Sequence, residues 1–205
     1  MRQNILNPEQ SYTFSDYFKM RIRTEDVLAH FGYKKSNEEF IFAKSNIELI
    51  NFEGLSNQII EHLIHISMEN EITRREFLMA PIMSFVRHLT EAKLSSEYWI
   101  EINHQLRGSL DYYLKRENEL LVVEAKNADL TRAFTQLAVE LVAIDKAEET
   151  DKEIIYGAVS TGQEWQFGRL DRTNKRFFQD INTYTVPSNL EDIVRILIGI
   201  LENEN

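Results

Sequence analysis

The sequence predicts an α/β fold in which a mixed central β-sheet is flanked by helices and preceded by a helical N-terminal extension. Three observations lead to this prediction. The N-terminal third contains short segments whose apolar residues have helical spacing. Three strand-like segments then follow one another between Tyr98 and Lys126, and a long helical segment separates them from further strands. This order of helices, strands, helix, strands and a last helix is typical of helices packed on a mixed sheet.

Residues 1–72 are predicted to form a mostly helical extension packed on the core. Two short segments, SDYFKM and TEDVLAHFG, have helical composition, and Gly32 at the end of the second suits a helix C-cap. Residues 38–44 (EEFIFAK) predict a strand. Residues 57–69 place apolar side chains at helical spacing and predict an amphipathic helix.

Residues 73–205 are predicted to form the core. Its first helix is expected over 73–89, and Thr73 with Glu76 has the spacing of a capping box. The residues RENE fit a tight hairpin between the last two of the three strands that follow. The apolar segment 153–160 is typical of a strand buried inside a sheet. The other predicted elements are strands at 98–106, 109–116, 119–126, 164–171, 176–181 and 183–187, and helices at 129–147 and 192–201.

Composition restricts the class of protein. The chain has 205 residues and no cysteine, so disulfides and thiolate metal sites are excluded and a cytoplasmic location is expected. Neither the N-terminal segment nor ILIGIL near the C-terminus has the length and apolarity of a signal or membrane-spanning segment, so no membrane partner is expected. The net charge of -10 argues against a protein that coats nucleic acid, because such binding depends on Lys and Arg. An enzyme that acts on nucleic acid through locally concentrated positive charge remains compatible with it.

Charged residues at the end of an apolar strand form the main candidate site. The run LLVV is followed by Glu124 and Lys126, which share one face because side chains alternate along a strand. Asp111, in the preceding antiparallel strand, joins them if the hairpin register pairs it with Glu124. Two neighbouring carboxylates repel each other, and a hard divalent cation such as Mg²⁺ relieves that repulsion. The sequence thus predicts a Mg²⁺ site on Asp111 and Glu124, against the alternative of a solvated strand end with a weak ion pair.

Asp111 followed by Glu124-Ala125-Lys126 resembles the active-site signature of the PD-(D/E)XK nuclease superfamily. The resemblance implies a restriction-endonuclease-like αβββαβ core. It also implies that Asp111 and Glu124 bind Mg²⁺, with Mn²⁺ as a substitute, and that Lys126 assists the attacking water. The chain departs from the signature at Leu110, where the family often has proline.

Further features extend the resemblance over the C-terminal part of the chain. The segment YGAVSTGQEWQFGRLD resembles the nuclease domains of type I restriction motor subunits. Many members of the superfamily have a Gln on the helix after the motif, for which Gln136 fits, with Glu140 one turn later. Many also have an acidic residue on the first core helix, for which Glu76 is the candidate. The N-terminal third has no such likeness.

Some of these residues also have structural explanations. Capping of the helix explains Glu76 equally well, and a hydrogen bond to a backbone group would explain Gln136 in an otherwise apolar helix face. A basic cluster around a predicted turn is a candidate for phosphate contacts, although solubility of a hairpin tip explains it as well. The cluster consists of Arg169, Arg172, Lys175 and Arg176.

The expected function is that of a Mg²⁺-dependent nuclease, a hydrolase of phosphodiester bonds with DNA as its partner; a homodimer is left open. The alternative is a catalytically inactive nuclease-fold module that binds nucleic acid or a partner protein. Presence of all three residues of the Asp–Glu–Lys set favours the enzyme, because a purely structural descendant has no reason to keep all three.

Overall fold

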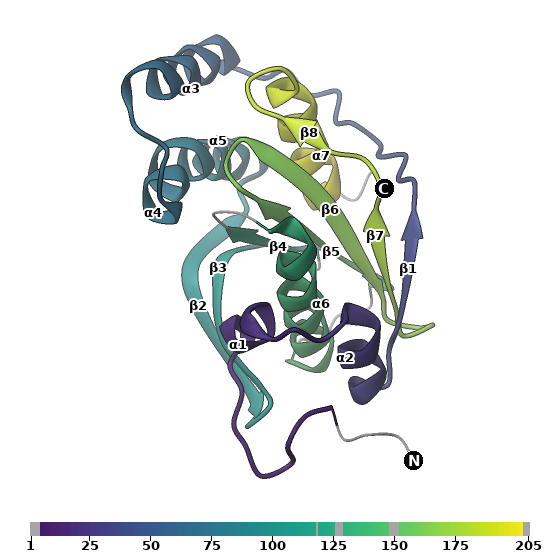
Figure 1. Cartoon of the computed structure of the whole chain (residues 1–205). Coiled ribbons are helices and arrows are strands. Elements are labelled where there is room, and N and C mark those ends of the chain that lie inside the picture. Colours follow the sequence, from purple (N-terminus) through teal and green to yellow (C-terminus); the bar gives the residue numbers. More distant parts are fainter. Residues whose placement is uncertain (1–4, 118, 126–128, 148–151, 203–205) are drawn as a thin grey trace.

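The structure is a computed structural model that describes residues 5–117, 119–125, 129–147 and 152–202 of the chain (Figure 1). Its centre is one mixed eight-stranded sheet in the order β1-β7-β6-β5-β4-β3-β2, with β8 paired to β6. The strands are β1 (Lys34–Glu38), β2 (Lys93–Asn103), β3 (Leu106–Arg116), β4 (Glu119–Ala125), β5 (Ile154–Ser160), β6 (Glu164–Asp171), β7 (Arg176–Asp180) and β8 (Tyr184–Thr185). The helices are α1 (Phe14–Lys19), α2 (Thr24–Phe31), α3 (Phe52–His65), α4 (Glu71–Arg74), the π-helical turn η1 (Arg75–Met79), α5 (Ala80–Thr90), α6 (Leu130–Ala147) and α7 (Leu190–Leu201).

The predicted α/β class, with a mixed sheet flanked by helices, is confirmed. Strands β2, β3 and β4 form an antiparallel meander, and β5 lies parallel to β4. A parallel neighbour requires a crossover connection, and α6 lies between β4 and β5 in the chain. From α5 to β5 the chain therefore runs helix, three strands, helix, strand.

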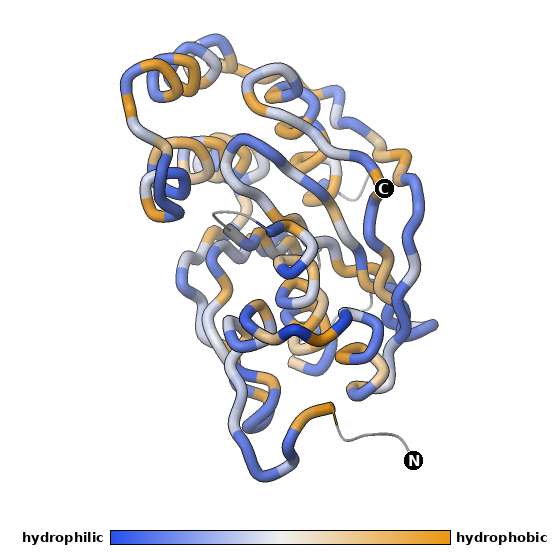
Figure 2. Tube along the Cα trace, in the orientation of Figure 1, coloured by the Kyte–Doolittle hydropathy of each residue, from blue (hydrophilic) through white to orange (hydrophobic). Residues whose placement is uncertain are grey.

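Helices cover both faces of the sheet, and each face has its own core. On one face α1, α2 and α6 pack on residues such as Leu110, Ile155 and Leu170. On the other, α3, η1, α5 and α7 pack on residues such as Leu121 and Ala158. Helix α6 is buried along nearly its whole length, and Figure 2 shows apolar residues along it and along the central strands. Glu124 lies at the rim of this rigid centre.

The N-terminal part of the chain differs from its prediction in two respects: the helix predicted over 57–69 spans Phe52–His65, and the strand is displaced. The strand lies at Lys34–Glu38 and not at 38–44, because β1 pairs in parallel with β7 and extends the sheet at that edge. Phe40 and Phe42, which follow it, instead pack into the core over Tyr156 and Phe167. Apolar alternation alone does not distinguish such a packed, irregular segment from a strand.

Two predicted boundaries are also wrong. Asn70, and not Thr73, caps the first core helix, because the Asn70 side chain accepts a hydrogen bond from the Thr73 amide at 2.8 Å. The strand predicted at 98–106 begins earlier, at Lys93, and ends before a turn at His104 and Gln105. No helix in the described part of the chain is both long and apolar enough to cross a membrane.

Candidate active site at the end of strand β4

The register between β3 and β4 decides whether the predicted site exists. Its pairs run from Arg116 opposite Glu119 to Tyr112 opposite Val123. Continued by one position, the same register places Asp111 opposite Glu124. Paired residues on neighbouring strands lie on the same face of a sheet. The metal-site hypothesis requires this pairing, whereas the contacts of the two carboxylates come from opposite sides of the sheet: Asp111 contacts Arg75 of η1, and Glu124 contacts Gln136 of α6.

Gln136 on α6 links two buried carboxylates. Its Nε2 lies 2.6 Å from Glu124 Oε1 and 2.8 Å from Glu140 Oε1. Because Nε2 carries two hydrogens and an ionised carboxylate only accepts, one amide group can donate to both. The exposed fractions are 1% for Glu124, 3% for Gln136 and 0% for Glu140. Helix α6 thus fixes the orientation of Glu124, which fits the active-site interpretation of Gln136 better than a bond to the backbone.

Arg75, at the start of η1, bridges Asp111 and Glu97. Its Nη1 lies 3.1 Å from Asp111 Oδ1, and its Nη2 lies 2.6 Å from Glu97 Oε1. The β2–β3 pairs on either side, Ser96 with Tyr112 and Tyr98 with Leu110, place Glu97 opposite Asp111. Extended in this way, the two registers would bring acidic residues to opposing positions on three neighbouring strands.

The electrostatics of this cluster follow from its burial and charge. Burial alone would lower the pKa of Arg75, but Asp111 and Glu97 outweigh it and raise that pKa, so the guanidinium remains charged. Burial raises the pKa of Tyr112, although the nearby guanidinium opposes this. The Tyr112 hydroxyl donates to the Arg75 carbonyl at 3.2 Å, and the guanidinium lies 5.7 Å from the centre of the Tyr112 ring. These contacts hold the Arg75 backbone and side chain against β3.

Arg75 and Glu97 are absent from the predicted site. Arg75 belongs to the adjacent pair Arg74-Arg75, which has no spacing that marks a site. Glu97 has a positive φ of 51°, uncommon for a residue other than glycine, so strand alternation does not predict its direction. Only the hairpin register, counted back from the turn at His104, could have placed Glu97 beside Asp111.

Two other predicted site residues fall outside the contacts described so far. Lys126 lies outside the described residues. Glu76 is exposed and lines a hollow between α3 and α5, together with residues such as Gly54 and Pro81. Its predicted role in a capping box with Thr73 is wrong, since Asn70 caps that helix.

The basic cluster of the β6–β7 hairpin is engaged mainly within the chain. Arg172 Nε lies 2.6 Å from Asp145 Oδ1, and the same guanidinium donates to main-chain carbonyls. Arg169 pairs with Glu38 at 2.9 Å and lies over the rings of Phe40 and Phe178. Of the remaining two, Arg176 donates to Ser36 at 2.6 Å and Lys175 is exposed. The contacts of Arg172 and Arg169 are structural, which leaves few donors for a ligand.

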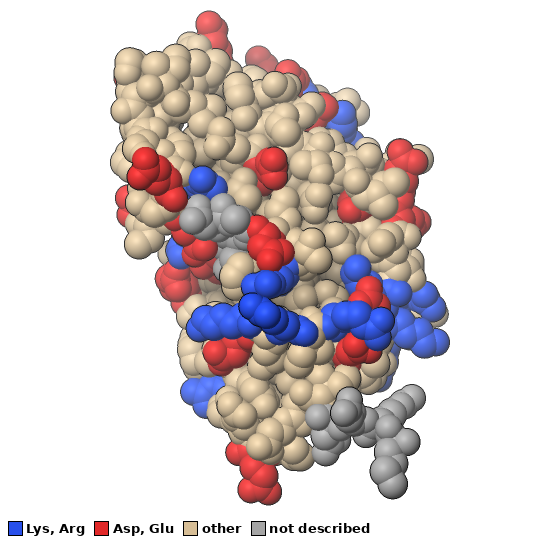
Figure 3. All heavy atoms as spheres, viewed as in Figure 1, with Lys and Arg blue, Asp and Glu red and all other residues tan. Residues whose placement is uncertain are grey.

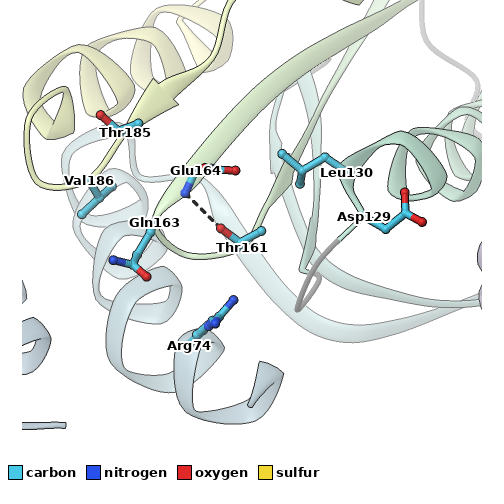
Figure 4. Close-up of a pocket in the computed structure, with 8 residues that line it drawn as sticks. All are labelled: Arg74, Asp129, Leu130, Thr161, Gln163, Glu164, Thr185 and Val186. Carbon is cyan, nitrogen blue, oxygen red and sulfur yellow. Dashed lines mark hydrogen bonds between the residues drawn. The ribbon is translucent and has the colours of Figure 1, made fainter. Parts of the chain in front are cut away.

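A cavity of about 650 Å³ lies between the turn that follows β5 and the start of α6 (Figure 4). Asp129 and Leu130, at the start of α6, line one side of it, and Arg74 lines another. The turn after β5 lines the rest, where Thr161 Oγ1 accepts from the Glu164 amide at 3.0 Å. Ligands commonly bind at the carboxyl ends of parallel strands, and this cavity lies beside the carboxyl end of β5.

The donor set fits a hard cation with few protein ligands. Asp111 and Glu124 offer carboxylate oxygens, and Gln136 Oε1 is buried and accepts no hydrogen bond from the described residues. Mg²⁺ commonly uses one or two carboxylates and retains several waters. Among the described residues no group of three or more His, Asp or Glu side chains could hold a metal ion. A metal here would thus depend on two carboxylates and solvent.

Comparison with known proteins adds no family to this description: no protein-family model matches the chain, and no curated protein shows significant sequence similarity to it.

Proposed function

We propose that the chain is a metal-dependent hydrolase of phosphodiester bonds in nucleic acid, with DNA as its substrate class. The observation that carries the proposal is the β3–β4 register, which runs to Tyr112 opposite Val123 and, extended by one position, would bring Asp111 opposite Glu124 at the end of a buried strand. A buried apolar strand that ends in charged residues gives a rigid support for a site. The resemblance of Asp111, Glu124 and Lys126 to a nuclease signature agrees with it.

The chain's own residues would divide the work as follows. Asp111 and Glu124 would hold Mg²⁺, which when bound supplies Lewis-acid polarisation of the scissile phosphate. Gln136 keeps one oxygen of Glu124 in a fixed position through its 2.6 Å hydrogen bond. Lys126 is expected to orient the attacking water. Arg75 offsets the negative charge of Asp111 while no cation is bound.

A second candidate function has one observation in its favour. The Arg75 guanidinium lies 3.1 Å from Asp111, where a metal would compete with it for the carboxylate. In a catalytically inactive nuclease-fold module such an internal cation would replace the metal permanently. The module would then bind nucleic acid or a protein without cleaving it.

A nuclease assay with matched variants distinguishes the two. The purified chain is incubated with Mg²⁺ or Mn²⁺ and plasmid, single-stranded DNA, branched DNA or RNA. We expect metal-dependent cleavage that falls by about 100-fold or more in Asp111→Asn, Glu124→Gln and Lys126→Ala, the range typical of lost acid–base groups. Glu53→Gln, an exposed change on α3, is the control and should leave cleavage unchanged.

Two outcomes would count against the enzyme. If the Lys126→Ala variant cleaves as fast as the parent chain, the assignment of the active site is wrong. Absence of cleavage on every substrate, together with no Mn²⁺ binding by calorimetry, would favour the binding module.

A further inference from the structure

A row of cationic side chains lines a second hollow, on the face of the sheet that carries α1, α2 and α6. The hollow has a volume of about 460 Å³. The segment between α1 and α2, the first turn of α2, β1 and the first turns of α6 form its walls. We call its cationic members the basic patch: Arg21, Arg23, Lys35 and Arg132.

The basic patch stands out against the charge of the whole chain. The net charge is -10, yet Lys and Arg gather in a band across this face (Figure 3). Glu25 is the one acidic residue among those that line the hollow. Local concentration of one sign of charge is what attracts an anionic ligand to a protein of opposite net charge.

The arginines of the basic patch keep donors for a ligand, whereas Lys35 is only 13% exposed and pairs with Glu25 at 3.4 Å. Arg23 pairs with Asp26 at 2.8 Å and Arg132 pairs with Asp129 at 3.0 Å, but all four side chains are well exposed. Exposed pairs of this kind contribute little to stability, so another anion can compete for these guanidinium groups. Arg21 is exposed and forms no salt bridge with any residue that the structure describes.

Helix α6 connects the basic patch to the candidate active site. Arg132 and Gln136 are four residues apart on α6, so they lie one turn apart on the same side of the helix. Thr135 lines the hollow, while the next residue, Gln136, holds Glu124. A buried hydrogen bond of 2.7 Å between the hydroxyls of Thr24 and Thr135 fixes α2 on α6. Arg132 of the basic patch therefore lies one helical turn from the residue that holds Glu124.

We propose that the basic patch binds the phosphodiester backbone of nucleic acid and guides it toward Asp111 and Glu124. Arginine suits phosphate oxygens because its planar guanidinium donates two parallel hydrogen bonds. Nucleic acid carries a negative charge at every phosphate, so several neighbouring cations suit it better than a single pocket would. Consecutive residues at the start of α6 line the two spaces. Asp129 and Leu130 line the cavity beside the turn after β5, and Thr131 and Arg132 line the hollow of the basic patch. This inference rests on the proposed function for the identity of the ligand.

The test is binding, measured without cleavage. A fluorescently labelled DNA duplex is titrated with the full chain in EDTA, and anisotropy is followed over a range of salt concentrations. For Arg21→Ala with Arg132→Ala we expect about 50-fold weaker binding and a salt dependence reduced by about two phosphate contacts. The corresponding lysine double variant should retain most of the affinity, because counterion release depends on charge. Arg87→Ala, an exposed arginine on α5, is the matched control and should bind as the parent does.

The outcomes separate this inference from the proposed function. Loss of binding in the alanine double variant, with no cleavage by the parent chain, supports the basic patch and overturns the hydrolase. Equal binding by the parent and the alanine double variant overturns the basic patch, whether or not the chain cleaves DNA. Failure of the parent to bind the duplex, or displacement by polyglutamate as effective as by unlabelled DNA, overturns it as well.

Discussion

Arg75 Nη1 lies 3.1 Å from Asp111 Oδ1, so the carboxylate that is expected to bind a metal is already paired with a cation from η1. The two side chains are 22% and 13% exposed, which makes this a largely desolvated pair. In the proposed site, a metal ion and the guanidinium would compete for the same negative charge. The competition makes metal affinity depend on Arg75.

Arg75→Gln should tighten Mn²⁺ binding by roughly tenfold or more, because hydrogen bonds to charged groups contribute about 1.5–3 kcal/mol. Isothermal titration calorimetry on the parent and variant chains measures this directly. Arg87→Gln changes an exposed arginine on α5 and should leave the affinity as it is. Equal affinity of the parent and Arg75→Gln would mean that Asp111 is not a metal ligand.

Gln136→Leu should destabilise the protein by about 2–3 kcal/mol, because it removes the donor that Glu124 and Glu140 share inside the core. Urea unfolding measures the loss. The same substitution at the exposed Gln58 should stay within about 0.5 kcal/mol of the parent.

A double-mutant cycle tests the cause of that loss. Combining Gln136→Leu with Glu140→Leu should cost less than the sum of the two single changes, since each side chain has lost a partner already. Additive losses would show that the Gln136 amide and the Glu140 carboxylate do not stabilise each other.

The sequence predicts the central strands and α6 well because their burial dictates their composition. Leu121 and Val123 are fully buried on one face of β4, and α6 carries apolar residues nearly all round. Strong burial on both sides leaves few alternatives to a central strand and its crossover helix. The register of the β3–β4 hairpin is also predictable, because it follows from the position of the turn at Glu117.

The remainder of the site depends on contacts between distant parts of the chain. Arg75 and Asp111 are 36 residues apart, and Arg75 lies in a π-helical turn between α4 and α5 that packs beside β3. Glu97 takes part through an irregular backbone conformation. Residues of the basic patch come from the α1–α2 segment, β1 and α6. Such tertiary neighbours have no periodicity that a sequence displays.

The contribution of Asp180 to the free energy of unfolding should be more favourable in acid than at neutral pH. Burial raises its pKa above the ordinary value of 3.8, although amides of Asn182 and Phe40 oppose this. A raised folded-state pKa gives a stabilising contribution that is complete below the unfolded pKa and is lost as pH rises through the folded one. The stability of the parent relative to Asp180→Asn, measured by urea unfolding between about pH 3 and 7, should therefore fall as pH rises.

Asp16→Asn is the opposite case and serves as its comparison. A hydrogen bond from the Thr13 amide lowers the pKa of Asp16. Its contribution is present above pH 3.8 and is lost as pH falls through the lowered value. The stability of the parent relative to this variant should therefore rise with pH. Equal slopes for the two aspartates would contradict both assignments.

Gly199→Ala should destabilise the protein by about 1–3 kcal/mol, the cost of forcing an extra methyl group into a packed interior. A Cβ at Gly199 in α7 would collide with the Ala43 carbonyl, which belongs to the backbone and cannot rotate away as a side chain could. This close approach lets the segment after β1 lie on α7, where the Ser45 amide also donates to the Arg195 carbonyl at 3.2 Å.

Gly54→Ala is the matched control, since Gly54 also lies in a helix, α3, but has no atom within 4 Å of the added Cβ. It should stabilise the protein by about 0.5–1 kcal/mol through helix propensity. Thermal unfolding of the two variants and the parent measures both effects. If Gly199→Ala and Gly54→Ala shifted the melting temperature in the same direction, the segment at Ala43 would not be packed against α7 as described.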